Sequence, residues 1–211
     1  MKATERKQNL KMALIAAAER AVAARGLAGL KARNLAAEAG CAVGAIYNVV
    51  ADLDDLALAV NSRTLAALEE ELTAAASVDP AKPAVGAERA TGRLIRMANA
   101  YLDFAAANTM RWRALFEHRL PEGKPMPGWY LGEQIRLFGY IEQPMRDLQP
   151  GQPPDQLAML ARSLFSAVHG IITLGLEERL GAVSLEELRN QTTLIVSAIV
   201  TGLLAPGKAV L

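Results

Sequence analysis

The sequence predicts an all-α fold, and three observations support that prediction. Alanine occurs throughout the 211 residues and β-branched residues rarely cluster, so helix propensity is high along the whole chain. Apolar residues recur at the spacing of amphipathic helices, and no segment alternates apolar and polar residues as a half-buried strand does. Glycine and proline separate the periodic segments. With 52% hydrophobic residues, the chain can bury a substantial core.

Three helices are predicted in the N-terminal quarter. An amphipathic helix covers 6–24, and Gly26 ends it in the position of a C-cap glycine. Short helices follow over 32–39 and 43–49, and the tight turn 40–42 separates them. The apolar stripe of the first helix comprises Leu10, Leu14, Ala17, Ala18, Ala21 and Val22.

Longer helices are predicted for the remainder. Asp52 is the expected N-cap of a helix that reaches Ser77, and the proline-containing segment 79–83 breaks it. Ser184 and Glu187 form the capping box of the last helix. The helix after Asp52 should bury Leu53, Leu56, Val60, Leu65, Leu68 and Leu72. The other helices are expected over 85–107, 109–118, 129–148, 155–180 and 184–204.

Charge is distributed unevenly along the chain, although the formal net charge is only +1. Residues 1–47 contain eight basic and three acidic side chains, a net of +5, so the remainder carries −4. A basic first quarter suggests a module that faces nucleic acid, but a solvated N-terminal helix would have the same charge. The basic residues are Lys2, Arg6, Lys7, Lys11, Arg20, Arg25, Lys31 and Arg33.

Cysteine content and hydropathy restrict the class of protein. The single cysteine, Cys41, excludes an internal disulfide framework and a multi-cysteine zinc site, and favours a reducing compartment. No apolar run approaches the roughly 18 residues of a membrane helix, and no signal peptide is recognisable. We therefore expect a cytoplasmic protein without a membrane partner.

Enzymatic motifs are missing from the sequence. It contains no phosphate-binding loop, no nucleophile elbow and no paired histidine ligands. Leu115 and Ser166 stand three residues before His118 and His169, so a di-iron pattern is excluded as well. A helical enzyme is thus the weaker hypothesis, and we expect no catalytic residue, no metal and no cofactor.

The segment 31–50 carries the most informative pattern. Two short helices joined by a glycine-containing turn form a helix-turn-helix, whose second helix enters the major groove of DNA. Gly44 and Ala45 keep that helix thin, the Tyr47 hydroxyl can reach a phosphate, and Asn48 can bond a base or the backbone. Small apolar contacts can lock the two helices together through Leu35, Ala36, Ala39, Cys41 and Ile46.

Residues 8–60 resemble the TetR family (TetR/AcrR type) of transcriptional regulators. The resemblance implies a DNA-binding domain of three helices, predicted over 1–60, and a larger helical domain for ligand binding and dimerisation, predicted over 61–211. It also implies a homodimer on a palindromic double-stranded DNA operator, usually a repressor that a small-molecule effector releases. The DNA-contacting residues that it implies are Lys31, Arg33, Ala42, Val43, Ala45, Tyr47 and Asn48.

Several positions depart from the family pattern. Ala42 replaces the serine that often caps the recognition helix, and Lys31 stands where a capping threonine is common. Leu53 stands where a phosphate-contacting lysine is common, and Asp54 and Asp55 follow it. These departures leave an alternative open: a family member that has lost operator binding and acts as a ligand- or protein-binding module.

Large side chains concentrate in the middle of the chain, as in an ordinary core or in a pocket for an apolar effector. The segment 165–170 resembles the Trp-x-x-x-His-Gly signature of one TetR C-terminal subgroup, with Phe165 in the tryptophan position. His169 fits a ligand contact or a core histidine bonded to a neighbouring helix, and His118 fits a helix C-cap. The candidate ligand-binding residues are Met97, Tyr101, Phe104, Trp112, Phe116, Trp129, Phe138, Phe165 and His169.

The last two predicted helices carry more apolar residues than a small domain easily buries. A four-helix bundle between two subunits would cover them, whereas packing within one chain is the simpler alternative. These residues are Leu157, Leu160, Leu164, Val168, Ile171, Ile172, Leu194, Ile195, Ala198, Ile199 and Leu203.

Overall fold

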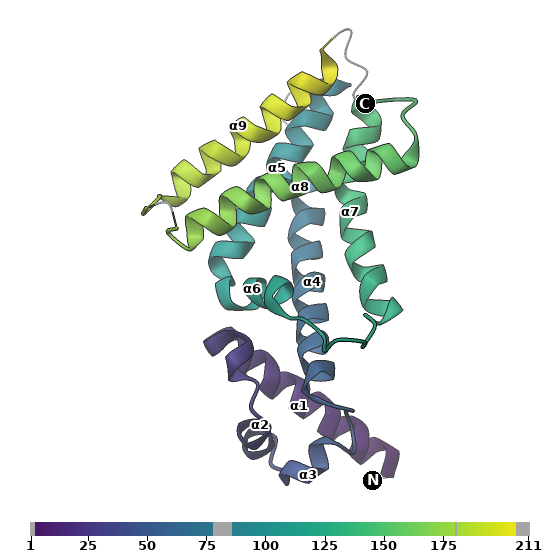
Figure 1. Cartoon of the computed structure of the whole chain (residues 1–211), viewed down its shortest axis with the longest axis vertical. Coiled ribbons are helices and arrows are strands. Elements are labelled where there is room, and N and C mark those ends of the chain that lie inside the picture. Colours follow the sequence, from purple (N-terminus) through teal and green to yellow (C-terminus); the bar gives the residue numbers. More distant parts are fainter. Residues whose placement is uncertain (1–2, 78–85, 180, 206–211) are drawn as a thin grey trace. The chain divides into compact units, whose positions relative to one another are not determined.

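The computed structural model describes residues 3–77, 86–179 and 181–205 and confirms the all-α fold. No strand forms within those ranges. The predicted break at 79–83 and the side chain of Lys2 lie outside them. The chain divides into two compact units (Figure 1). The first unit consists of Met1–Ala67 and Ala107–Glu133, and the second of Leu68–Ala106 and Gln134–Leu211.

The first unit is built around the N-terminal helices. Leu35 and Ile46 are fully buried among the apolar residues of the first helix, so the small side chains lock the helix-turn-helix as predicted. Ala114 joins the same core from a helix distant in sequence. The helices of this unit are α1 (Ala3–Arg25), η1 (Gly26–Gly29, a 3₁₀ turn), α2 (Ala32–Glu38), α3 (Val43–Ile46), α6 (Thr109–Glu117) and the first parts of α4 (Leu53–Ser77) and α7 (Gly128–Leu148).

Glycines shape the turns that position the helix-turn-helix. Gly26 (φ +60°) and Gly40 (φ +68°) adopt left-handed backbone conformations that side-chain-bearing residues rarely tolerate. A Cβ at Gly29 would collide with the backbone carbonyl of Ala21, so α1 and η1 can pack closely only with glycine there. These three positions explain why the chain can leave α1 and enter α2 over so few residues.

The recognition helix α3 is shorter than predicted, because it ends at Ile46 instead of Val49. Ala42, its N-cap, offers no side-chain hydrogen bond to the first turn, and Gly44 lowers helix propensity. Turn-type hydrogen bonds from Asn48 to Ala45 (3.2 Å) and from Val49 to Ile46 (3.0 Å) continue the winding. Residues 47–49 therefore continue the helical winding of α3 as turns, although they lie outside the helix itself.

The second unit contains the remaining long helices. The Ser184 hydroxyl accepts a hydrogen bond from the Glu187 N–H (3.1 Å), as the capping box predicts. The helix before it ends at Leu176 instead of Leu180, since Glu178 takes a left-handed conformation (φ 52°). The helices of this unit are α5 (Ala87–Ala107), α8 (Pro154–Leu176), α9 (Leu185–Leu204) and the remaining parts of α4 and α7; α8 and α9 lie side by side (Figure 1).

Helix α8 is unusually apolar. Among the described helices it alone meets the length and hydropathy of a membrane span, with a mean hydropathy of 1.6 over its best window, of which 28% is buried. The sequence prediction had found no run of that length. A core helix of a soluble protein meets the same criterion, so composition by itself says little about a membrane.

Candidate nucleic-acid interface and effector site

The predicted DNA-contacting side chains form one accessible surface around α2 and α3. Tyr47 is 52% exposed although the adjacent Ile46 is fully buried, so the helix anchors one side in the core and presents the other. Ala45 is half-buried, and the other predicted residues are exposed: Lys31, Arg33, Ala42, Val43, Tyr47 and Asn48.

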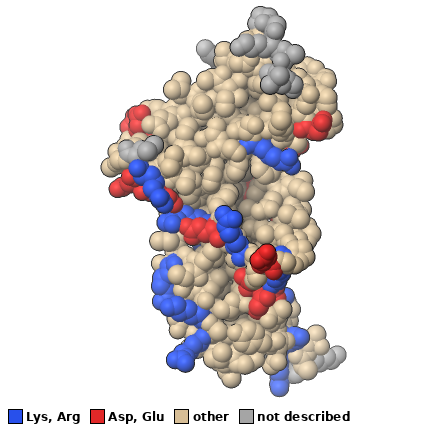
Figure 2. Space-filling view, in the orientation of Figure 1, with Lys and Arg blue, Asp and Glu red and all other residues tan. Residues whose placement is uncertain are grey.

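Two acidic residues of the first unit, Glu38 and Glu19, are paired with arginines. Glu38 pairs with Arg20 (2.5 Å), and Glu19 lies between Arg63 (2.8 Å) and Arg111 (3.1 Å). Lys31 and Arg33, by contrast, form no ion pair with any described residue. Figure 2 shows Lys and Arg side chains over the end of the unit that carries α2 and α3. The cations nearest to the recognition helix are therefore available to an anion such as phosphate.

The acidic start of α4 is held by contacts inside the first unit. Asp52 caps the helix as predicted, because its Oδ1 accepts from the Asp55 N–H (3.0 Å). Asp55 in turn accepts from the Ala51 N–H (2.8 Å). Leu53 packs against the core, so the position where the family commonly has a lysine has a structural role here.

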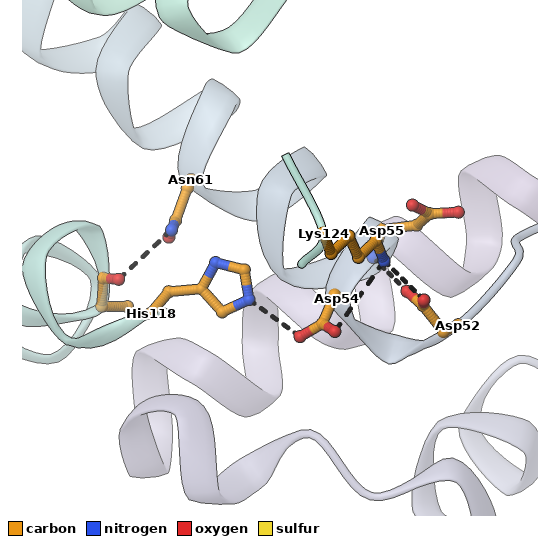
Figure 3. Close-up of polar contacts among 7 residues, drawn as sticks. Asp52, Asp54, Asp55, Asn61, His118 and Lys124 are labelled. Atoms are coloured by element: carbon orange, nitrogen blue, oxygen red, sulfur yellow. Dashed lines mark hydrogen bonds and ion pairs between the residues drawn. The ribbon is translucent and has the colours of Figure 1, made fainter. Parts of the chain in front are cut away.

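Two side chains from distant parts of the sequence, Lys124 and His118, contact these carboxylates (Figure 3). Lys124 Nζ lies 2.5 Å from Asp52 and 3.9 Å from Asp54, and His118 Nε2 lies 3.0 Å from Asp54. The hydrogen bond from Lys124 holds the pKa of Asp52 below its usual value. His118 is the C-cap residue of α6, as predicted, but its side chain faces α4 instead of its own helix end. Sequence analysis did not anticipate either contact, because neither partner is near in sequence.

In the second unit, four of the predicted ligand-binding residues come together. Phe165 stacks on His169 (centroids 5.4 Å apart), and its ring also meets Phe138 (5.4 Å) and Tyr101 (5.7 Å). The Tyr101 hydroxyl lies 2.9 Å from His169 Nδ1, which joins α5 to α8. This aromatic cluster (Tyr101, Phe138, Phe165 and His169) combines apolar surface with one polar group, as effector sites commonly do.

The other predicted ligand-binding residues are divided between the units. Met97 and Phe104 are buried in the second unit. Trp112, Phe116 and Trp129 belong to the first unit, where Trp112 is fully buried and the other two are largely exposed. Membership of all nine residues in one effector site therefore stays a prediction. The described residues also contain no group of three or more His, Cys, Asp or Glu side chains that could hold a metal.

The burial of His169 predicts a pH-dependent stability. Burial lowers the pKa of His169 below its ordinary value of 6.5, so the folded state takes up a proton less readily than the unfolded chain. Stability should therefore decrease as the pH falls below about 6.5, down to the lowered folded pKa. Urea unfolding at pH 7, 6 and 5 should show this decrease in the wild type and a flatter profile in His169→Gln. Parallel profiles would contradict the assignment.

Comparison with known proteins identifies the class. Residues 94–198 match the model of the tetracyclin repressor-like C-terminal domain. A protein of unknown function from Rhodococcus sp. RHA1 is 24% identical, with 93% of this chain and 96% of that chain covered (TM-score 0.69). A TetR-family transcriptional regulator from Streptomyces coelicolor shares the fold at 20% identity, with 97% of this chain and 90% of that chain covered (TM-score 0.62). A putative transcriptional regulator from Pseudomonas aeruginosa PAO1 shares it at 22% identity, with 98% of this chain and 93% of that chain covered (TM-score 0.60). No curated protein matches significantly.

A helix-turn-helix unit together with a helical unit of this kind is the architecture of TetR-family transcriptional regulators. Residues 94–198, just under half of the chain, match a C-terminal domain of the TetR type, and the chain has the fold of TetR-family regulators.

Proposed function

We propose that the protein is a homodimeric repressor that binds a palindromic operator and is released by a small, largely apolar molecule. The observation that carries this proposal is the exposure of Tyr47 together with that of Arg33 and Lys31, two cations without an ion-pair partner in the described chain. In this proposal, residues 1–60 bind DNA, and residues 61–211 bind the effector and dimerise in the cytoplasm.

Exposed apolar side chains on α8 and α9 support dimerisation through these helices. Leu194 is 71% exposed, and Met159, Leu174, Leu185 and Leu204 are also largely exposed. A second copy of the same two helices would cover them in a four-helix bundle. This partner also accounts for an apolar α8 without requiring a membrane.

The aromatic cluster of the second unit is the proposed effector site. An apolar molecule bound there would contact α5, α7 and α8, which supply the four rings. Effector binding would change the separation of the two recognition helices in the dimer. Operator half-sites are spaced by about 34 Å, one turn of DNA, so a changed separation would lower the affinity.

The alternative is a family member that has lost operator binding. The observation that favours it is the start of α4, where Leu53 occupies the position of an expected lysine and Asp54 and Asp55 follow it. Asp52 and Asp54 are, however, bound by Lys124 and His118, which reduces their repulsion of a DNA backbone. We therefore retain the DNA-binding regulator as the main proposal.

Selection of bound duplexes from a random DNA pool, followed by sequencing, tests the proposal. A regulator of this kind should enrich a partly palindromic motif with half-sites about one helical turn apart. The selected duplex should then bind less tightly when an effector fills the aromatic cluster. Absence of enrichment at low salt, where phosphate contacts are strongest, would support the alternative.

A further inference from the structure

Three buried polar atoms meet between α4 and α7 in the first unit. They are Oδ1 of Asn61, the hydroxyl of Tyr130 and Oε2 of Glu133, and none of them has a hydrogen-bond partner within the described residues. Asn61 and Tyr130 are 1% and 2% exposed. Buried polar atoms are nearly always satisfied in folded proteins, so three such atoms in one place require an explanation.

The hydrogen bonds made by the other polar atoms of Asn61 and Glu133 show which of their atoms remain without a partner. The amide nitrogen of Asn61 donates to the Ala114 carbonyl (3.2 Å; Figure 3), so the amide oxygen must face the other way. Oε1 of Glu133 accepts from the Ser62 hydroxyl (2.8 Å), which leaves Oε2 for another partner. Burial raises the pKa of Tyr130, the nearby Asn61 amide lowers it in part, and the charge of Glu133 raises it further. Both side chains therefore influence the Tyr130 hydroxyl.

The cluster lacks hydrogen-bond donors. Asn61 Oδ1 and Glu133 Oε2 can only accept, and the one proton among the three atoms is that of the Tyr130 hydroxyl. If Tyr130 donates to either oxygen, the other oxygen remains unsatisfied. Glu133 also forms no ion pair in the part of the chain that the structure describes. An occupant must therefore supply N–H or O–H groups, and a positive charge would complement Glu133.

We propose that Asn61, Tyr130 and Glu133 form a binding site for a small organic amine in its protonated state. Glu133 is the counter-ion, and the two uncharged groups orient the remaining N–H bonds. Trp129, whose ring lies edge-on to Tyr130 (centroids 5.6 Å apart) and is half exposed, offers an apolar wall for the hydrocarbon part. An ordered water molecule would satisfy the hydrogen bonds but would leave the carboxylate without a counter-ion. The site uses residues outside the aromatic cluster, and binding to it does not require DNA.

The test compares three six-carbon probes on the full-length protein at pH 7. Hexylammonium chloride should bind saturably in isothermal titration calorimetry and raise the melting temperature, whereas 1-hexanol and hexanoate should bind at least tenfold more weakly. Glu133→Gln keeps the size and the Ser62 contact but removes the charge, and should weaken hexylammonium binding about tenfold or more. Tyr130→Phe removes only the hydroxyl and should weaken it severalfold. Glu122→Gln, an exposed glutamate in the same unit, is the matched control and should bind as the wild type does.

The opposite outcomes overturn the proposal. Hexylammonium that fails to bind the wild type at millimolar concentration would show that the cluster holds water alone. Equal binding of the three probes, or equal hexylammonium binding by wild type and Glu133→Gln, would exclude ion-pair recognition. If Glu133→Gln does not fold, the comparison of the three probes on the wild type and the hexylammonium affinity of Tyr130→Phe still test the proposal. The affinity of the same variants for a selected DNA duplex is measured without amine. This measurement distinguishes a failure of the amine site from a failure of the repressor proposal.

Discussion

Replacing Leu194 with glutamate should convert the protein from a dimer to a monomer. Leu194 is the most exposed large apolar residue on α9, and two negative charges brought together at an apolar interface would be strongly unfavourable. Light scattering should show a mass near the 22.5 kDa of one chain, instead of twice that value. Each half-site would then be bound singly, and operator affinity should fall by about 100- to 10,000-fold.

A matched substitution separates this effect from the general cost of a new surface charge. Ile135 on α7 is 68% exposed, close to the exposure of Leu194, but lies outside α8 and α9. Ile135→Glu should leave both the mass and the operator affinity unchanged. A Leu194→Glu protein that stays dimeric would refute the proposed interface, as would a wild type that is monomeric at micromolar concentration.

Substitution of the recognition surface should weaken specific DNA binding strongly without unfolding the protein. Tyr47→Phe removes one hydroxyl that is proposed to donate to a phosphate, a charge-assisted bond whose loss costs about tenfold in affinity per subunit. A dimer loses two such bonds, so about a hundredfold is expected. Arg33→Ala should weaken binding across sequences and reduce the salt dependence of the dimer by about two counterions. Because both side chains are exposed, the melting temperature should hardly change.

Electrophoretic mobility shift on the selected duplex, measured at several salt concentrations, provides the readout. Arg146→Ala is the control, since Arg146 is an exposed arginine of the second unit and its loss changes the net charge equally. Unchanged affinity in both Tyr47→Phe and Arg33→Ala would favour the alternative in which operator binding has been lost. A large loss of stability would instead indicate that these residues support the fold.

Much of the secondary structure could be predicted, because its causes are local. The apolar spacing of α1, the cap at Asp52 and the capping box at Ser184 each depend on residues within two turns of one another. The errors lie at helix ends. Helix α3 ends before Val49, because Ala42 caps it weakly. Helix α8 ends before Glu178, because that residue has a left-handed backbone conformation. Apolar periodicity does not report either effect.

The candidate site could be predicted only in part. The exposed face of α3 follows from the helix-turn-helix pattern, since a buried Ile46 requires that Tyr47 point elsewhere. Of the predicted ligand-binding residues, Tyr101, Phe138 and Phe165 are in ring contact, whereas Trp112 and Trp129 belong to the other unit. Composition identifies which residues are large and apolar, and it does not identify which of them meet.

Residue type and short spacing are enough to predict the helices, the helix-turn-helix and the basic character of the first quarter. Which distant side chains meet depends instead on tertiary packing. It brought Lys124 and His118 to the carboxylates of α4, and it left Asn61, Tyr130 and Glu133 together with too few donors. Such contacts join segments more than 50 residues apart, and their partners are selected by the packing of whole helices, which no local pattern specifies.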